Sequence, residues 1–248
     1  MVRFGTTFRA ALLAAAGLAG LVAGCKPDKA EPQVTSPYTE SLTIAVAPVL
    51  NFSGDFTLDP VKAADLLASE LSDVQGIVVL PVNRVMAVLA MQNKVQIESP
   101  AHALAVAEAV GADAILVPGI TEYDPYVPVV GLVLQMYTVP RRPLAPLDAR
   151  VLSRQLAPVA IAEMTDPLRP TSQTQVVYNG THEQVAKSVR YYAKSRDEDP
   201  NPLGWKQYLK VQSLYLRFCW HDAVERLMEA ERAGQAVMAD GRSMEVTP

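Results

Sequence analysis

The chain has 248 residues, with 22 Lys and Arg against 26 Asp and Glu, 19 prolines and two cysteines. A net charge of −4 at pH 7 leaves no basic excess to bind phosphates, so we expect no nucleic-acid partner. The length suits one domain with a substantial core, or a small α/β domain with added helices.

The first 24 residues have the pattern of a secretory signal peptide. Arg3 and Arg9 give a positive start, residues 10–23 are small and apolar, and no acidic residue comes before Asp28. This apolar run of 14 residues is too short to cross a bilayer as a stable helix. Removing residues 1–24 takes away two basic residues and no acidic ones, which leaves 20 against 26 and a net charge of −6.

The signal peptide ends in Val22-Ala23-Gly24-Cys25, which resembles the bacterial lipobox. This resemblance implies cleavage between Gly24 and Cys25, a diacylglycerol on the Cys25 thiol, and an acyl chain such as palmitate on its new amine. Each buried acyl CH₂ contributes about 0.8 kcal/mol, so such a lipid anchor is effectively permanent. The alternative is a secreted protein with a chance cysteine, or a signal anchor. With Cys25 acylated, only Cys219 is left, and we expect no intramolecular disulfide.

Residues 25–40 are predicted to form a lipidated, extended tether, because they contain three prolines and many charges. In Gram-negative lipoproteins an aspartate directly after the cysteine commonly retains the protein in the inner membrane. Lys26 stands there instead. The expected location is therefore the cell envelope, with the lipid in the outer membrane and the protein facing the periplasm.

Residues 41–121 alternate apolar strand patterns with helix signals. Asp59-Pro60 and Ser99-Pro100 each combine an N-cap residue with a proline at the first helical position, and Gly111 is typical of a helix C-cap. The expected strands are 41–50, 77–82 and 114–121, and Asn83 is expected to cap a short helix between the last two. The order βαβααβ requires a largely parallel sheet with helical crossovers.

The second half of the chain changes character. A turn at 123–126 leads to an expected hairpin strand at 129–137, and residues 139–172 are rich in proline, with one expected strand near 159–162. A last strand is expected at 173–178. Thr181 and Gln184 have capping-box spacing, and a long helix is expected from about 205 to 233 after a hinge.

Together these patterns predict an α/β fold with a mixed, partly parallel sheet, formed as βαβααβ and then a hairpin, plus a carboxy-terminal helical extension. The expected divisions are a signal peptide at 1–24, a tether at 25–40, an α/β domain with a proline-rich insertion at 41–180, helices at 181–236 and a flexible tail at 237–248.

Three short segments carry a family resemblance: IAVAPVLNFSGD at 44–55, VVLPVNRV at 78–85 and GADAILV at 111–117. They resemble the α/β module of the amino-terminal domain of TolB, of the curli-secretion lipoproteins and of the lipoprotein activators of penicillin-binding proteins. The match covers about residues 42–137, and Ala47 and Val49 depart from the usual Leu and Phe. The resemblance implies a protein that works through protein contacts.

The residues that could catalyse a reaction are few and scattered. The three histidines are His102, His182 and His221, and Cys219 lies only two residues from the last of them on an expected helix. Residues two apart on a helix face different sides, so a packed cysteine beside a surface histidine is the expected arrangement. Asp197-Glu198-Asp199 is interpreted as a solvated hinge, and Ser53-Gly54-Asp55 as a turn that needs no bound anion. We expect no enzyme activity, no metal and no cofactor other than the covalent lipid at Cys25.

The expected partner contacts are Tyr123 and Tyr126 on the hairpin, and Arg141 and Arg142 between prolines. The two arginines could contact phospholipid head groups or an acidic partner, and a plain exposed loop is the alternative. For the tyrosines, including Tyr137, half-buried packing is the alternative. The favoured function is a lipid-anchored interaction or assembly component with an envelope protein as its partner. Two alternatives stay open, namely an oligomeric secretion lipoprotein of the curli type and an envelope hydrolase. Self-association into a homo-oligomer is also open.

Overall fold

The computed structural model describes residues 34–124, 126–140, 168–196 and 202–244, within a compact unit that spans Gln33–Pro248. Several predictions lie outside the described residues: the signal peptide, the lipidation and cleavage site at Gly24 and Cys25, most of the tether, Arg141 and Arg142, the strand near 159–162 and the acidic run 197–199.

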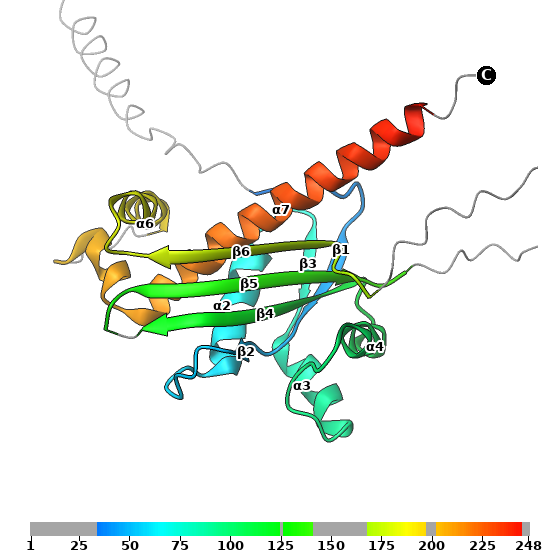
Figure 1. Cartoon of the computed structure of the whole chain (residues 1–248), viewed down its shortest axis with the longest axis horizontal. Coiled ribbons are helices and arrows are strands. Elements are labelled where there is room, and N and C mark those ends of the chain that lie inside the picture. Colours follow the sequence, from blue (N-terminus) through cyan, green and yellow to red (C-terminus); the bar gives the residue numbers. More distant parts are fainter. Residues whose placement is uncertain (1–33, 125, 141–167, 197–201, 245–248) are drawn as a thin grey trace, which may run out of the picture. The chain divides into compact units, whose positions relative to one another are not determined.

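One mixed sheet forms the centre of the molecule (Figure 1). Its strand order is β3-β1-β4-β5-β6, and the short strand β2 pairs with β4. The first four strands are parallel where they pair, and β5 and β6 are antiparallel additions. The predicted fold class is confirmed. The strands are β1 (Leu42–Val46), β2 (Leu50–Asn51), β3 (Ile77–Leu80), β4 (Ala114–Asp124), β5 (Val129–Thr138) and β6 (Ser172–Asn179).

Two helices begin at the capping residues that the sequence predicts. Asp59 accepts hydrogen bonds from the N–H groups of Val61 and Lys62, and Ser99 caps the next predicted helix. Gly111 ends that helix with φ 75°, the left-handed conformation that favours glycine. The helices are α2 (Pro60–Ser72), α3 (Val82–Met91), α4 (Pro100–Val110), α6 (Glu183–Arg196), the 3₁₀ helix η1 (Gly204–Leu209) and α7 (Gln212–Met244).

Two predicted caps are wrong. Asn83 is already inside α3, because the chain passes directly from Pro81, fixed at φ −59°, into the helix at Val82. Thr181 donates its hydroxyl to Asn179 at 2.6 Å, so this hydroxyl is engaged in an Asx turn, and α6 begins at Glu183.

The long carboxy-terminal helix also differs from expectation. The chain first forms η1, in which Tyr208 packs edge-on against the Tyr192 ring at 5.6 Å. The α-helical pattern starts only where the Val211 carbonyl accepts from the Tyr215 N–H. From there α7 continues to Met244, beyond the predicted end at 233 and into the predicted tail.

The two faces of the sheet have separate cores. The larger core lies between the sheet and α2, α6 and α7, and it includes the fully buried side chain of Trp220. The smaller core lies beneath α3 and α4, which gather near the end of the sheet where β4 begins (Figure 1). The β4–β5 turn and η1 are at the opposite end. Residues from the carboxy-terminal helices thus complete the main core.

Candidate functional site: the hairpin groove

The β4–β5 turn is fixed by one exposed carboxylate. Asp124 accepts hydrogen bonds from the N–H groups of Tyr126 and Val127, at 2.8 and 3.0 Å. The bonds from Val127 and then Tyr126 lower the pKa of Asp124, because they favour its charged form. Tyr126 is left 94% exposed at the tip.

A β-bulge in β4 turns the side chain of Tyr123, the residue before Asp124, toward the core side of the sheet. The pairing of β4 with β5 shifts between Ile120 and Glu122, so that two residues of β4 face Gly131. Without this extra residue the side-chain alternation would turn Tyr123 to the opposite face. With the bulge, Tyr123 pairs with Val130 and packs against the main core.

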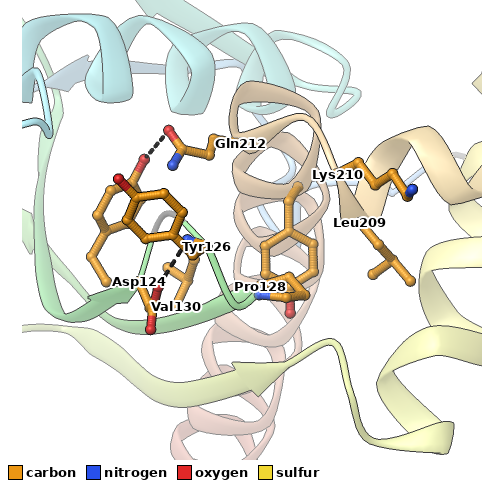
Figure 2. Close-up of a pocket in the computed structure, with 9 residues that line it drawn as sticks. Asp124, Tyr126, Pro128, Val130, Leu209, Lys210 and Gln212 are labelled. Carbon is orange, nitrogen blue, oxygen red and sulfur yellow. Dashed lines mark hydrogen bonds between the residues drawn. The ribbon is translucent and has the colours of Figure 1, made fainter.

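Tyr123 connects the hairpin to the first turn of α7. Its hydroxyl donates to the side-chain oxygen of Gln212 at 3.0 Å (Figure 2). Burial, and next the nearby charge of Asp55, raise the pKa of Tyr123. The hydroxyl therefore stays protonated and continues to donate at neutral pH.

Two adjoining cavities flank this Tyr123–Gln212 contact. One of about 250 Å³ lies on the hairpin side, and one of about 630 Å³ lies between the starts of α2 and α7. Tyr123, Lys210 and Gln212 line both, and we call the two together the hairpin groove. Figure 2 shows Tyr126, Pro128 and Val130 on the strand side of the smaller cavity, with Lys210 extending away from Tyr126.

The groove combines apolar surface with polar groups whose roles are structural. Tyr126, Val127 and Val211 are exposed beside it, and Phe56, next to the lining residue Thr57, is fully exposed. Its carboxylates, Asp59 and Asp124, are engaged with backbone N–H groups. Exposed aromatic side chains beside a small cavity are typical of protein contact sites.

The predicted tyrosines therefore separate into three environments. Tyr126 is exposed, Tyr123 is half-buried, and Tyr137 is buried in the smaller core with its hydroxyl donating to Gln135. The packing alternative is correct for Tyr137. Arg141 and Arg142 stay predictions.

Of the residues considered for catalysis, neither the histidines nor Cys219 line the groove. The ring of His102 bonds with the Glu98 N–H and the Gln92 side chain, and no histidine lines either cavity of the groove. In the turn after β2, the Ser53 hydroxyl donates to Asn51, as expected for a connector. Cys219 is fully buried, and this burial raises the pKa of its thiol well above the usual value. The packed cysteine is confirmed.

A buried ion cluster, which was not predicted, centres on Glu70. This α2 carboxylate is 1% exposed and receives Arg217 Nε at 2.8 Å and an Arg196 nitrogen at 3.0 Å. His221 lies 3.6 Å from it and packs against Tyr192, which corrects the expected surface position of this histidine. The cluster joins α2, α6 and α7, and its position on the buried face of α2 was the one available hint.

Among the described residues, no group of three or more His, Cys, Asp or Glu side chains is placed to hold a metal ion. In the same part of the chain, every helix is too short or too polar to cross a membrane.

Comparison with known proteins finds similarity at the level of structure. No protein-family model matches the sequence, and no curated protein matches it. The chain is similar to the LpoB carboxy-terminal domain from Salmonella enterica, with 17% identity and a TM-score of 0.34 over 41% of this chain and 74% of that one. It is also similar to lipoprotein GNA1162 from Neisseria meningitidis, with 17% identity and a TM-score of 0.39 over 63% and 99%.

A further similar structure is a PelC dodecamer from Paraburkholderia phytofirmans, with 17% identity and a TM-score of 0.27 over 42% of this chain and 66% of that one. Of these structures, GNA1162 is described as a lipoprotein.

Proposed function

We propose that this chain is a lipid-anchored protein of the bacterial cell envelope that acts as an interaction or assembly component. In this proposal Cys25 carries the lipid in the outer membrane, the folded unit faces the periplasm, and the hairpin groove contacts an envelope protein. The protein binds its partner without catalysing a reaction.

The observation that carries this proposal is the exposed aromatic surface beside the groove. Tyr126 is 94% exposed although the turn around it is held by two hydrogen bonds from Asp124. An exposed aromatic side chain on a held turn, beside a cavity of about 250 Å³, offers both an anchor and a receptor for one large apolar side chain of a partner.

The position of the amino-terminal segment supports a contact away from the anchor. The Arg232 guanidinium donates to the Thr35 carbonyl at 2.9 Å, and the Tyr38 hydroxyl donates to Glu231. These contacts lie about 30 Å along α7 from Val211, which borders the groove, at about 1.5 Å per residue. The segment that follows the proposed anchor thus docks far from the groove.

Palmitate labelling tests the anchor. We expect the wild type to incorporate labelled palmitate and to fractionate with membranes, and Cys25→Ala to lose the label and keep its precursor mass. A wild-type protein that takes up no palmitate would contradict the anchor and leave the groove proposal standing.

Quantitative cross-linking in intact cells with mass spectrometry tests the groove. The variants Tyr126→Ala and Val127→Ser should reduce partner cross-links at least about 5-fold, because the contact surface loses its apolar groups. Tyr191→Ala is the matched control, since this side chain is also exposed, at 64%, but lies on α6. Equal cross-link yields in all three variants would refute the groove as a contact site.

A further inference from the structure

The last strand of the sheet, β6, is an edge strand that no other described strand pairs with on its outer side. Its sequence SQTQVVYN contains no charged residue and no proline, and it is eight residues long. The other edge strand, β3, has only four residues and is preceded by a bridge between Thr35 and Gln75. Natural proteins usually protect long edges with charges, prolines or bulges, because an open edge pairs with other strands.

The pairing of β6 with β5 determines which backbone groups face outward. The Gly180 N–H donates to the Pro128 carbonyl across the Asn179–Val129 pair, which makes this a widely spaced pair of the antiparallel ladder. Because the ladder alternates, the residues at 173, 175, 177 and 179 direct their N–H and C=O groups away from β5. The Asn179 carbonyl already accepts from the His182 N–H at 3.0 Å. At Gln173, Gln175 and Val177, no hydrogen bond from another described segment reaches these groups.

We propose that β6 pairs antiparallel with β6 of a second copy of this chain. A two-fold axis at Gln175 places Gln175 opposite itself and Gln173 opposite Val177, and it engages these three outward residues in about six backbone hydrogen bonds. A shift of the register by two residues would place Gln173 opposite Asn179, whose carbonyl is already engaged by His182. The register centred on Gln175 uses only outward groups that have no other described partner.

The chemistry of β6 suits a copy of itself. An uncharged strand meets no like charge when it pairs with its own sequence. The Val177 side chain, 55% exposed, is covered by the opposing strand, and the Gln175 side-chain amides can bond to each other. No β6 residue lines the hairpin groove, so this inference goes beyond the proposed function and can fail separately from it.

Cysteine cross-linking of the full chain in detergent tests both the dimer and its register. Facing residues in a closely spaced antiparallel pair have Cα atoms about 5.5 Å apart, within disulfide reach. Gln175→Cys should therefore form a disulfide-linked dimer under mild oxidation, as should the double variant Gln173→Cys/Val177→Cys. Gln173→Cys alone should not, because its two copies lie about 14 Å apart. Val78→Cys on the opposite edge is the exposed control.

Light scattering of uncross-linked protein provides the second measurement. The wild type should be dimeric, and Val177→Lys should shift its dissociation constant at least about 10-fold, since the lysine removes the apolar contact and brings two positive charges into the interface. Val78→Lys should leave it unchanged. A monomeric wild type, or equal cross-linking of Gln173→Cys and Gln175→Cys, would overturn the proposal.

Discussion

Glu70 shows how a single residue can tie separate helices together. Its carboxylate is buried on α2 and is compensated by Arg217 from α7 and Arg196 from α6. Burial alone would lower the pKa of Arg217, but the hydrogen bond and the charge of Glu70 raise it. Arg196 also stacks over the Tyr192 ring at 5.0 Å and reaches Asp73. The cluster therefore joins three helices, with the charge of Glu70 on α2 neutralised by partners from α6 and α7.

Removing one partner of this cluster should destabilise the protein. We expect Arg217→Ala to lower the free energy of unfolding by about 1–3 kcal/mol, because one Glu70 oxygen loses its donor while it stays buried. Urea unfolding followed by circular dichroism measures the change. Arg190→Ala, on the exposed face of α6, is the control and should change stability by less than about 0.5 kcal/mol. Equal stability of the two variants would show that the cluster contributes nothing.

Gly131 is required by the bulge opposite it. A Cβ at this position would lie 2.6 Å from Thr121 Oγ1 and 3.2 Å from the Glu122 backbone nitrogen. Gly131→Ala should therefore destabilise the protein by about 1–3 kcal/mol. Gly234→Ala is the matched control, since it has open space within α7 and should be neutral or stabilising by up to about 1 kcal/mol. Thermal unfolding compares them, and a Gly131→Ala protein as stable as wild type would refute the bulge.

At the scale of the element, the first turn of α2 borders the groove and depends on its cap. Asp59→Ala removes the acceptor for two backbone N–H groups and should lower the free energy of unfolding by about 1 kcal/mol. Amide hydrogen exchange should accelerate at Val61 and Lys62. Asp65→Ala, an exposed change within the same helix, should affect neither measurement. Unchanged exchange in the Asp59 variant would argue against this cap.

Helix boundaries could be predicted from the sequence where they depend only on neighbouring residues. The caps at Asp59 and Ser99 and the turn at Gly111 depend on neighbouring residues, and they were predicted correctly. The cap at Thr181 failed because an equally local competitor, Asn179, binds its hydroxyl. The break between η1 and α7 depends on packing of Tyr208 against Tyr192, which no local pattern reveals.

The hairpin groove also combines local features, which the sequence indicates, with long-range contacts, which it does not. Tyr123 and Tyr126 were predictable because a hairpin turn brings them together. The contact of Tyr123 with Gln212 joins residues 89 apart in the sequence, and the Arg217–Glu70 pair joins residues 147 apart. Such pairs follow from the packing of α7 on the sheet. The bulge that orients Tyr123 could not be predicted either, since one extra residue in a strand leaves no distinct sequence pattern.

At the scale of the whole molecule, buried tyrosines tie stability to alkaline pH. Burial is the largest cause of a raised pKa in five tyrosines. For Tyr178 the charge of Asp222, which accepts its hydroxyl at 2.7 Å, adds to this effect. The five are Tyr123, Tyr137, Tyr178, Tyr192 and Tyr215.

The unfolded chain releases these protons near pH 10, whereas the folded protein keeps them. Above pH 10 the folded state therefore binds more protons, and the free energy of unfolding should fall as pH rises, with no such effect below about pH 9. Urea unfolding from pH 8 to 11 checks this, with absorbance at 295 nm reporting ionisation. Tyr178→Phe should reduce the slope. Complete ionisation of all nine tyrosines near pH 10 in the folded protein would contradict it.

Site-specific photo-cross-linking can detect the proposed contact between the hairpin groove and an envelope protein. A benzophenone amino acid is placed at Tyr126 or at the control position Tyr191 of the full chain in living cells. We predict a discrete adduct heavier than the protein from position 126 only, with mass spectrometry mapping the bond to one envelope protein. Adducts of equal yield from both positions, or none from position 126, would contradict the proposed contact.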